Sequence, residues 1–270
     1  MSAGSETAYA KLNVALHVRR KLDDGYHHIE TVFAFCEDGD ELSAEAATSS
    51  SSFQASGEFG VRIDPTDNLV TRAIEAMSRV TGCDQRAALH LKKRLPIASG
   101  LGGGSADAAA TLRLLNRLWG LNVPLEKLEE IGQELGADVP ACIRSQTARG
   151  AGRGDELELV DLGLSGAPVL LVNPRVEIST ADIFSRWDGV DRGPLDDWRH
   201  GRNDLQQVAE SLVPQVGGIL AWLSAQAGVD FVRMSGSGAT CFALFDSEPA
   251  RDHAAMAVPR EWWSLPTRLR

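Results

Sequence analysis

The sequence has few cysteines and no apolar run long enough to cross a membrane. Its 4 cysteines, in 270 residues, stand far apart, with no Cys-x-x-Cys pair and no histidine at metal-ligand spacing. We therefore expect buried reduced thiols rather than disulfides or a zinc site. No stretch approaches ~18 uninterrupted apolar residues, and residues 1–7 have neither a basic start nor an apolar core. These absences predict a cytoplasmic protein.

The chain also lacks an excess of basic residues. Lys and Arg total 27 against 37 Asp and Glu, so the formal net charge is −10. Nucleic acids and membrane surfaces are polyanionic, so we expect neither of them as a partner. A phosphate-bearing ligand would have to be bound locally, by helix ends, a few cations and a metal ion.

A glycine-rich run at residues 96–109 lacks the features of two familiar nucleotide motifs. It does not end in the Gly-Lys-Ser/Thr of the Walker loop, and no acidic residue after a second βαβ strand supports a dinucleotide fingerprint. Its glycines between Gly100 and Gly104 let the backbone adopt positive φ angles and approach a ligand closely. We interpret the run as a phosphate cradle that leads into a helix start, with a flexible surface loop as the alternative.

Hydrophobic spacing predicts strands that precede helices, and the pattern restarts after about residue 150. The expected strands are residues 8–19, 28–35, 87–91, 167–172 and two within 231–245. The expected helices are residues 68–80, Ser105 to a stop at Gly120, 124–136, 203–213 and 216–227. Residues 186–202 show little periodicity. We predict an α+β fold with two domains, 1–153 and 154–270.

Three separated segments together resemble the motifs of the GHMP kinase superfamily, whose members phosphorylate small alcohols or acids with ATP. The segments are residues 10–13, the glycine run and residues 234–240. The resemblance implies a two-lobed GHMP kinase fold, with a ribosomal protein S5 domain 2-like N-terminal lobe and a ferredoxin-like C-terminal lobe. It also implies an active site in the cleft between the lobes.

Three details resemble the subfamily that phosphorylates 4-diphosphocytidyl-2-C-methyl-D-erythritol in non-mevalonate isoprenoid biosynthesis. They are residues 10–13 followed by 24–27, the triple glycine within 100–105, and residues 135–140. The implied partners are ATP and this cytidine diphosphate-linked methylerythritol, bound by a monomer or homodimer. Two alternatives remain, a GHMP kinase for homoserine or mevalonate and a catalytically inactive nucleotide-binding module.

Asp138 and Lys11 are the candidate catalytic residues. An aspartate just beyond a helix end can accept or orient the proton of an attacking hydroxyl, although a helix cap or a turn is the alternative on sequence alone. Lys11 precedes Asn13 by two residues, so both side chains project from one side of an extended strand. The resemblance implies that Lys11 pairs with the catalytic aspartate and stabilises the transferring phosphoryl group. A solvated strand-end lysine is the alternative.

The resemblance also assigns residues to the two substrates. Tyr26 and Phe184 would stack on the cytosine while His27 hydrogen-bonds its edge, with core packing as the alternative for Phe184. Asn13 and Thr180 would contact the diphosphate or the erythritol hydroxyls. The residues implied for ATP are Gly100, Leu101, Gly102, Gly103, Gly104, Ser105 and Ala106 at the triphosphate, and Asn68, Lys93 and Pro96 at the adenine. Mg²⁺ is expected because phosphoryl transfer needs its charge on the phosphates, and Ser105 is a candidate ligand.

Two departures from the family pattern stand near these residues. Asp107 places a carboxylate in the first helical turn beside a polyanion site, so we expect it to point away from the phosphates. Residues 150–155 carry Arg153 where a plainer Ala-Gly-Gly-Glu-like turn is expected. Neither departure removes a candidate catalytic group.

Overall fold

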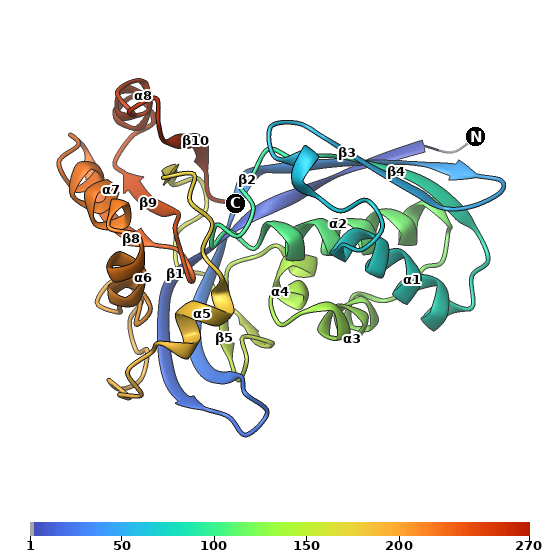
Figure 1. Ribbon diagram of the computed structural model, residues 1–270, viewed down its shortest axis with the longest axis horizontal. Coiled ribbons are helices and arrows are strands. Elements are labelled where there is room, and N and C mark those ends of the chain that lie inside the picture. The colour runs from blue at the N-terminus through green and yellow to red at the C-terminus, as the bar shows by residue number, and fades with distance from the viewer. Residues whose placement is uncertain (1–2) are drawn as a thin grey trace. The chain divides into compact units, whose positions relative to one another are not determined.

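The computed structural model describes residues 3–270 as a mixture of strands and helices (Figure 1). Its strands are β1 (Ala3–Lys21), β2 (His27–Ala47), β3 (Ser52–Ser56), β4 (Arg86–Lys92), β5 (Ala148–Ala151), β6 (Glu156–Leu159), β7 (Pro168–Asn173), β8 (Val229–Met234), β9 (Cys241–Phe245) and β10 (Trp263–Arg268). Its helices are α1 (Leu69–Thr81), α2 (Gly103–Leu118), α3 (Leu125–Leu135), α4 (Val139–Arg144), α5 (Thr180–Ser185), α6 (Gln206–Leu212), α7 (Gln215–Ser224) and α8 (Glu248–Met256), with a 3₁₀ turn at Gly60–Arg62.

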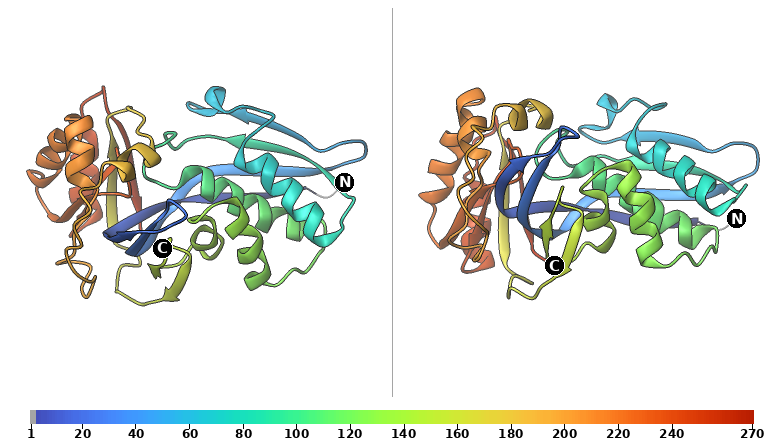
Figure 2. Two further views of the ribbon diagram at one scale, coloured as in Figure 1. Left: turned by 60° about the horizontal axis from the view of Figure 1, so that its bottom comes forward. Right: turned by 90° about the horizontal axis from the view of Figure 1, so that it is seen from below.

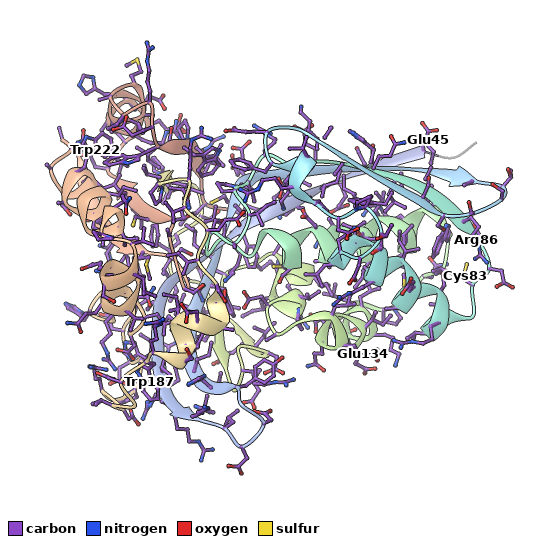
Figure 3. All side chains as sticks on the ribbon, in the orientation of Figure 1. Glu45, Cys83, Arg86, Glu134, Trp187 and Trp222 are labelled. Atoms are coloured by element: carbon purple, nitrogen blue, oxygen red, sulfur yellow. The ribbon has the colours of Figure 1, made fainter. Side chains whose placement is uncertain are left out.

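Each strand and helix expected from the sequence has a counterpart, which confirms the α+β prediction. The described part of the chain holds no helix with the length and apolar character that crossing a bilayer requires. The four cysteines are thiols, as expected; Cys36, Cys142 and Cys241 are buried, whereas Cys83, after α1, is half-buried (Figure 3).

The chain packs as two compact units. The first unit comprises the start of β1 through Ala10, Asp38–Ile97 and Gly102–Ser145, and the second comprises Lys11–Glu37, Ala98–Leu101 and Gln146–Arg270. This division does not coincide with the expected domains 1–153 and 154–270. The reason is that the long strands β1 and β2 each contribute residues to both units.

In the first unit, helices α1 to α4 lie along one side of the strands (Figures 1 and 2). β4 pairs antiparallel with residues 41–47 of β2 and parallel with β3. α1 begins at a capping box, because Asn68 Oδ1 accepts from the N–H groups of Val70 and Thr71 while Asn68 N–H donates to Thr71 Oγ1. The helix ends at Gly82, whose φ of 66° is left-handed.

A buried ion triad joins three parts of the first unit. Lys93 Nζ, just after β4, lies 2.6 Å from Asp40 Oδ2 in β2 and 2.5 Å from Asp107 Oδ2 in α2, and none of the three side chains is more than 5% exposed. Asp40 Oδ1 also accepts from the N–H groups of Arg94 and Leu95. Burial raises the pKa of Asp107 to about 7 against the opposing effect of Lys93. Burial would lower the pKa of Lys93, but the two carboxylates outweigh it and raise that pKa.

The second unit is built on an antiparallel sheet in the order β10-β7-β9-β8. Helices α7 and α8 cover one face of this sheet (Figure 2). Its core combines sheet residues such as Leu170 and Ala243 with Ile219 and Leu223 of α7. Residues 31–33 of β2 pair with β5, so the second unit also contains the turn end of the β1–β2 hairpin.

Replacing Lys93 by methionine is expected to lower the free energy of unfolding by about 3–5 kcal/mol, because two buried carboxylates would lose their shared counter-ion. Lys92 is the matched control: its side chain is 53% exposed and reaches Glu41 at 3.3 Å. Lys92→Met should change the free energy by less than about 0.5 kcal/mol. Urea unfolding followed by circular dichroism measures both, and equal small losses would contradict a structural role for the triad.

Candidate active site

The first part of the glycine run is shaped by close backbone contact within the second unit. Gly100 has a φ of +78°, and a Cβ there would lie 2.2 Å from the carbonyl oxygen of Ser235. Gly236 has a φ of +55°, and a Cβ there would lie 3.1 Å from the Gly100 carbonyl oxygen. Neither position accepts a side chain without a shift of the backbone. The two glycine loops, 100–101 and 235–238, therefore depend on each other's glycines.

The second part of the run forms the start of α2 in the first unit. Gly102 is the N-cap with a φ of 62°, and the helix begins at Gly103, two residues before the expected start at Ser105. Position 103 favours glycine although it lies inside the helix, because a Cβ there would lie only 3.0 Å from Lys93 Nζ. The first N–H groups of a helix have no acceptor within it, so this end presents donors and a positive dipole end to an anion. Phosphate binding at Gly100–Ala106 stays a prediction.

Lys11 and Asn13 lie side by side on β1, on one side of the strand as expected. Lys11 Nζ donates to Asn13 Oδ1 at 2.7 Å, and Lys11 N–H donates to the Leu101 carbonyl at 2.9 Å. The residue is only 3% exposed, so the alternative of a solvated strand-end lysine is wrong. Its ammonium also lies 5.3 Å from the centre of the Phe33 ring. Strand β1 thus brings a buried cation to the glycine run at Leu101.

Asp138 occupies the N-cap position of α4, directly after the end of α3. Its carbonyl oxygen accepts from Cys142 N–H at 3.1 Å, while its side chain makes no capping hydrogen bond to α4. The side chain is half-buried. A helix cap therefore does not explain this carboxylate. Asp138 belongs to the first unit and Lys11 to the second, and their pairing stays a prediction.

An aromatic cluster surrounds His27 at the start of β2. The centre of its ring lies 5.0 Å from the Phe184 ring of α5 and 5.7 Å from the Trp187 ring that follows this helix (Figure 3). Burial and the charge of Lys21 lower the pKa of His27, so the imidazole is neutral at pH 7, with one donor and one acceptor nitrogen. Trp187 was not anticipated, although its spacing of three from Phe184 is typical of one helical face.

Tyr26 is the exposed member of this region, at 52%. The guanidinium of Arg153 lies 4.7 Å from the centre of its ring. Arg153 also reaches Asp24 at 3.9 Å and Asp155 at 3.7 Å. The arginine that departs from the family pattern therefore packs on the ring expected to stack on a base.

The remaining predicted residues have partners within their own units. Thr180, at the start of α5, places Oγ1 2.9 Å from Ser237 Oγ in the second glycine loop. The Asn68 amide caps α1 and donates to the Asp64 carbonyl at 2.7 Å, and Pro96 is buried. Lys93 is held in the ion triad. The adenine contacts expected of Asn68, Lys93 and Pro96 stay predictions.

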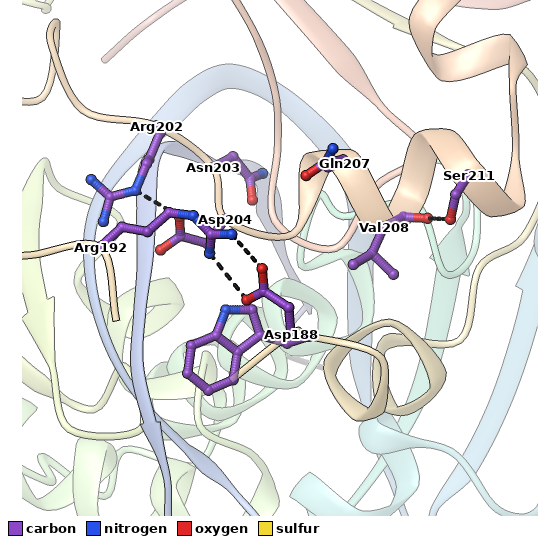
Figure 4. Close-up of a pocket in the computed structure, with 9 residues that line it drawn as sticks. Asp188, Arg192, Arg202, Asn203, Asp204, Gln207, Val208 and Ser211 are labelled. Carbon is purple, nitrogen blue, oxygen red and sulfur yellow. Dashed lines mark hydrogen bonds and ion pairs between the residues drawn. The ribbon is translucent and has the colours of Figure 1, made fainter. Parts of the chain in front are cut away.

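A cavity of about 380 Å³ opens in the second unit between residues 187–192 and 202–211 (Figure 4). Ion pairs of Asp188 with Arg192 and of Arg202 with Asp204 line it. Trp187 forms part of its wall and also contacts His27. The cavity therefore adjoins the aromatic cluster, and the irregular segment expected at residues 186–202 supplies one side of it.

Comparisons with known proteins agree with this arrangement. The GHMP kinases N terminal domain matches residues 68–146, and the GHMP kinases C terminal domain matches residues 189–264. A curated 4-diphosphocytidyl-2-C-methyl-D-erythritol kinase from Rhizorhabdus wittichii is 50% identical over 279 residues, which cover 98% of this chain and 94% of the relative. The kinase of the same name from Novosphingobium aromaticivorans is 49% identical over 272 residues, which cover 98% and 92%.

A solved structure extends the match to three dimensions. The crystal structure of a 4-(cytidine 5'-diphospho)-2C-methyl-D-erythritol kinase matches with a TM-score of 0.83 and 29% identity, covering 98% of this chain and 99% of the other. Sequence and fold thus agree over nearly the whole chain. With both of its domains matched and full-length relatives at half identity, this chain belongs to the GHMP kinase family and has its two-domain α+β fold.

Proposed function

We propose that this protein transfers the γ-phosphoryl group of ATP to the 2-hydroxyl of 4-diphosphocytidyl-2-C-methyl-D-erythritol, a step of non-mevalonate isoprenoid biosynthesis. The observation that carries the proposal is the ring cluster of His27, Phe184 and Trp187 in the same unit as the buried Lys11–Asn13 pair. An aromatic surface with a neutral imidazole suits a nucleobase. Homoserine and mevalonate carry no such group, so a kinase for either would have no use for it.

In this proposal the protein acts mainly through position and charge, as phosphoryl transfer requires. Residues Gly100–Ala106 bind the triphosphate, with the backbone N–H groups of the first turn of α2, before Ala106, as donors. The Lys11 ammonium stabilises negative charge on the transferring group. Asp138 accepts or orients the proton of the attacking 2-hydroxyl.

The acceptor would be selected by the second unit. Tyr26 and Phe184 would stack on the cytosine, and His27 would use its donor and acceptor nitrogens on the base edge. Asn13 and Thr180 would bind the erythritol hydroxyls or the diphosphate. The Asn13 amide oxygen has a second lone pair beyond the one that Lys11 uses. The substrates are small charged molecules, and we place the reaction in the cytoplasm, in a monomer or homodimer.

Mg²⁺ is part of the proposal as a companion of the nucleotide. Within residues 3–270, no group of three or more His, Cys, Asp or Glu side chains is placed to hold a metal ion. Mg²⁺ commonly takes few protein ligands and completes its shell with phosphate oxygens and water. Ser105, half-buried in the first turn of α2, is the candidate protein ligand. When bound, the ion neutralises charge on the phosphates.

The purified protein is expected to consume ATP with the cytidyl acceptor, and not with homoserine or mevalonate. Chelation with EDTA should abolish turnover, and added MgCl₂ should restore it. A coupled assay of ADP release measures each combination. Turnover with mevalonate or homoserine alone would contradict the proposed acceptor. Tight ATP binding without turnover on any acceptor would favour the inactive nucleotide-binding module.

Asp138→Asn is expected to lower kcat by roughly 100- to 10,000-fold, since the amide cannot take up the hydroxyl proton. The KM for ATP should change little. Asp84→Asn is the matched control in the same unit, because Asp84 is exposed between α1 and β4. Steady-state kinetics on folded variants test the pair, and undiminished turnover in Asp138→Asn would remove this aspartate from the mechanism.

His27→Ala is expected to raise the KM for the cytidyl acceptor by roughly 3- to 10-fold, the loss of about one hydrogen bond to an uncharged group. The KM for ATP should stay constant. His28 is the neighbouring control, since alternation along β2 turns its side chain to the other face. If His28→Ala raised the acceptor KM as much as His27→Ala, the assignment of His27 to the base would fail.

A further inference from the structure

We propose that Thr31 is a positioning residue for Lys11, acting through the side-chain amide of Asn13. Thr31 lies in β2, is 1% exposed and carries no family motif. Its hydroxyl is the third group of a chain that runs from Lys11 Nζ to Asn13 and then to Thr31. The inference rests on the proposed function, because the importance of Lys11 does.

The donor and acceptor roles of the Thr31 hydroxyl are fixed by its two partners. Thr31 Oγ1 donates its hydrogen to the Ala15 carbonyl at 2.6 Å, and a carbonyl can only accept. Toward Asn13, at 2.8 Å, the same hydroxyl is therefore an acceptor. The Asn13 atom that faces it must be the NH₂ group, and the amide oxygen must face the other way.

The other end of the chain makes the same demand independently. Lys11 Nζ carries only donors, so the Asn13 atom at 2.7 Å from it must be the oxygen. A flipped amide would point NH₂ at the ammonium and oxygen at a hydroxyl whose hydrogen is already used. Lys11, Asn13 and Thr31 are each no more than 3% exposed, so water does not replace the lost bonds.

The backbone of Asn13 is held by a second hydroxyl of the same kind. Asn13 N–H donates to Ser235 Oγ at 3.1 Å, and Ser235 Oγ donates to the Gly100 carbonyl at 2.8 Å. This contact fixes the strand against the glycine run but leaves the side-chain amide free to rotate. Thr31 is the contact that sets the amide, and the amide oxygen then gives the Lys11 ammonium one partner in a fixed place.

Thr31→Val keeps the size and branching of the side chain but removes the acceptor. The Asn13 amide then loses the bond that sets its direction, and Lys11 loses a fixed partner. Preorganised charge matters most in the transition state, so the loss should fall on kcat rather than on ATP binding. Thr31→Ser keeps the hydroxyl and should preserve the chain.

The test is steady-state kinetics of both variants, with melting curves to confirm folding. Thr31→Val should lower kcat by roughly 10- to 100-fold with the KM for ATP within about twofold of the parent, as expected for a misplaced catalytic group. Thr31→Ser should stay within about threefold of the parent kcat. Thr267→Val is the control for removal of a buried hydroxyl in the same unit, and its kcat should not change. If Thr31→Val does not fold, Thr31→Ala carries the same expected loss of kcat.

A kcat in Thr31→Val equal to that of the parent would overturn the proposal. So would a loss in Thr31→Ser as large as in Thr31→Val, since that would point to packing of the methyl group. The ratio of variant to parent kcat is taken on whichever acceptor the parent phosphorylates. A different acceptor therefore defeats the proposed function alone, whereas an unchanged ratio defeats the role of Thr31 alone.

Discussion

Two buried carboxylates share one ammonium in the first unit, and the first turns of α2 are held by that arrangement. Lys93 binds Asp40 of β2 and Asp107 of α2, and it lies so close to Gly103 that a Cβ there would meet Nζ at 3.0 Å. The glycine at 103 thus serves the packing of α2 against Lys93. Because separating such charges in a dry interior is costly, sheet and helix start form one body.

Much of the fold follows from hydrophobic period and from breakers. Gly82, Gly120 and Gly136 mark helix ends, and the strands at β1, β4 and β7 show their pattern clearly. The short elements show no such pattern in the sequence. α5 has six residues and β6 four, too few to display a period. α5 is held by contacts with distant residues such as His27 and Ser237, and β6 by pairing with β5. The α2 start was expected two residues late because glycines count against a helix in propensity but fit this one for space.

The candidate site also has residues that the sequence predicts and residues that it does not. Lys11, Asn13 and the glycine run stand on local motifs, so their residues could be chosen from the sequence. Their partners could not, because Thr31 and Ser235 are ordinary polar residues until the fold brings them within hydrogen-bond reach of Asn13. Trp187 likewise becomes part of the His27 cluster only through the path of the irregular segment after α5. Contacts between residues that lie far apart in the chain are what a single sequence does not predict.

Lys93 and Lys11 are both buried, and the oxygens that contact them differ in charge, which bears on how an acidic protein can bind a polyanion. Lys93 faces two carboxylates, which neutralise its charge locally, so it adds little positive potential at the start of α2. Asn13 contacts Lys11 through a neutral oxygen, which itself adds no negative charge beside the ammonium. At a net charge of −10, long-range attraction favours no phosphate ligand. Binding must come from short-range groups held in place, and an amide oriented by the Thr31 hydroxyl places its oxygen at the Lys11 ammonium without adding a charge.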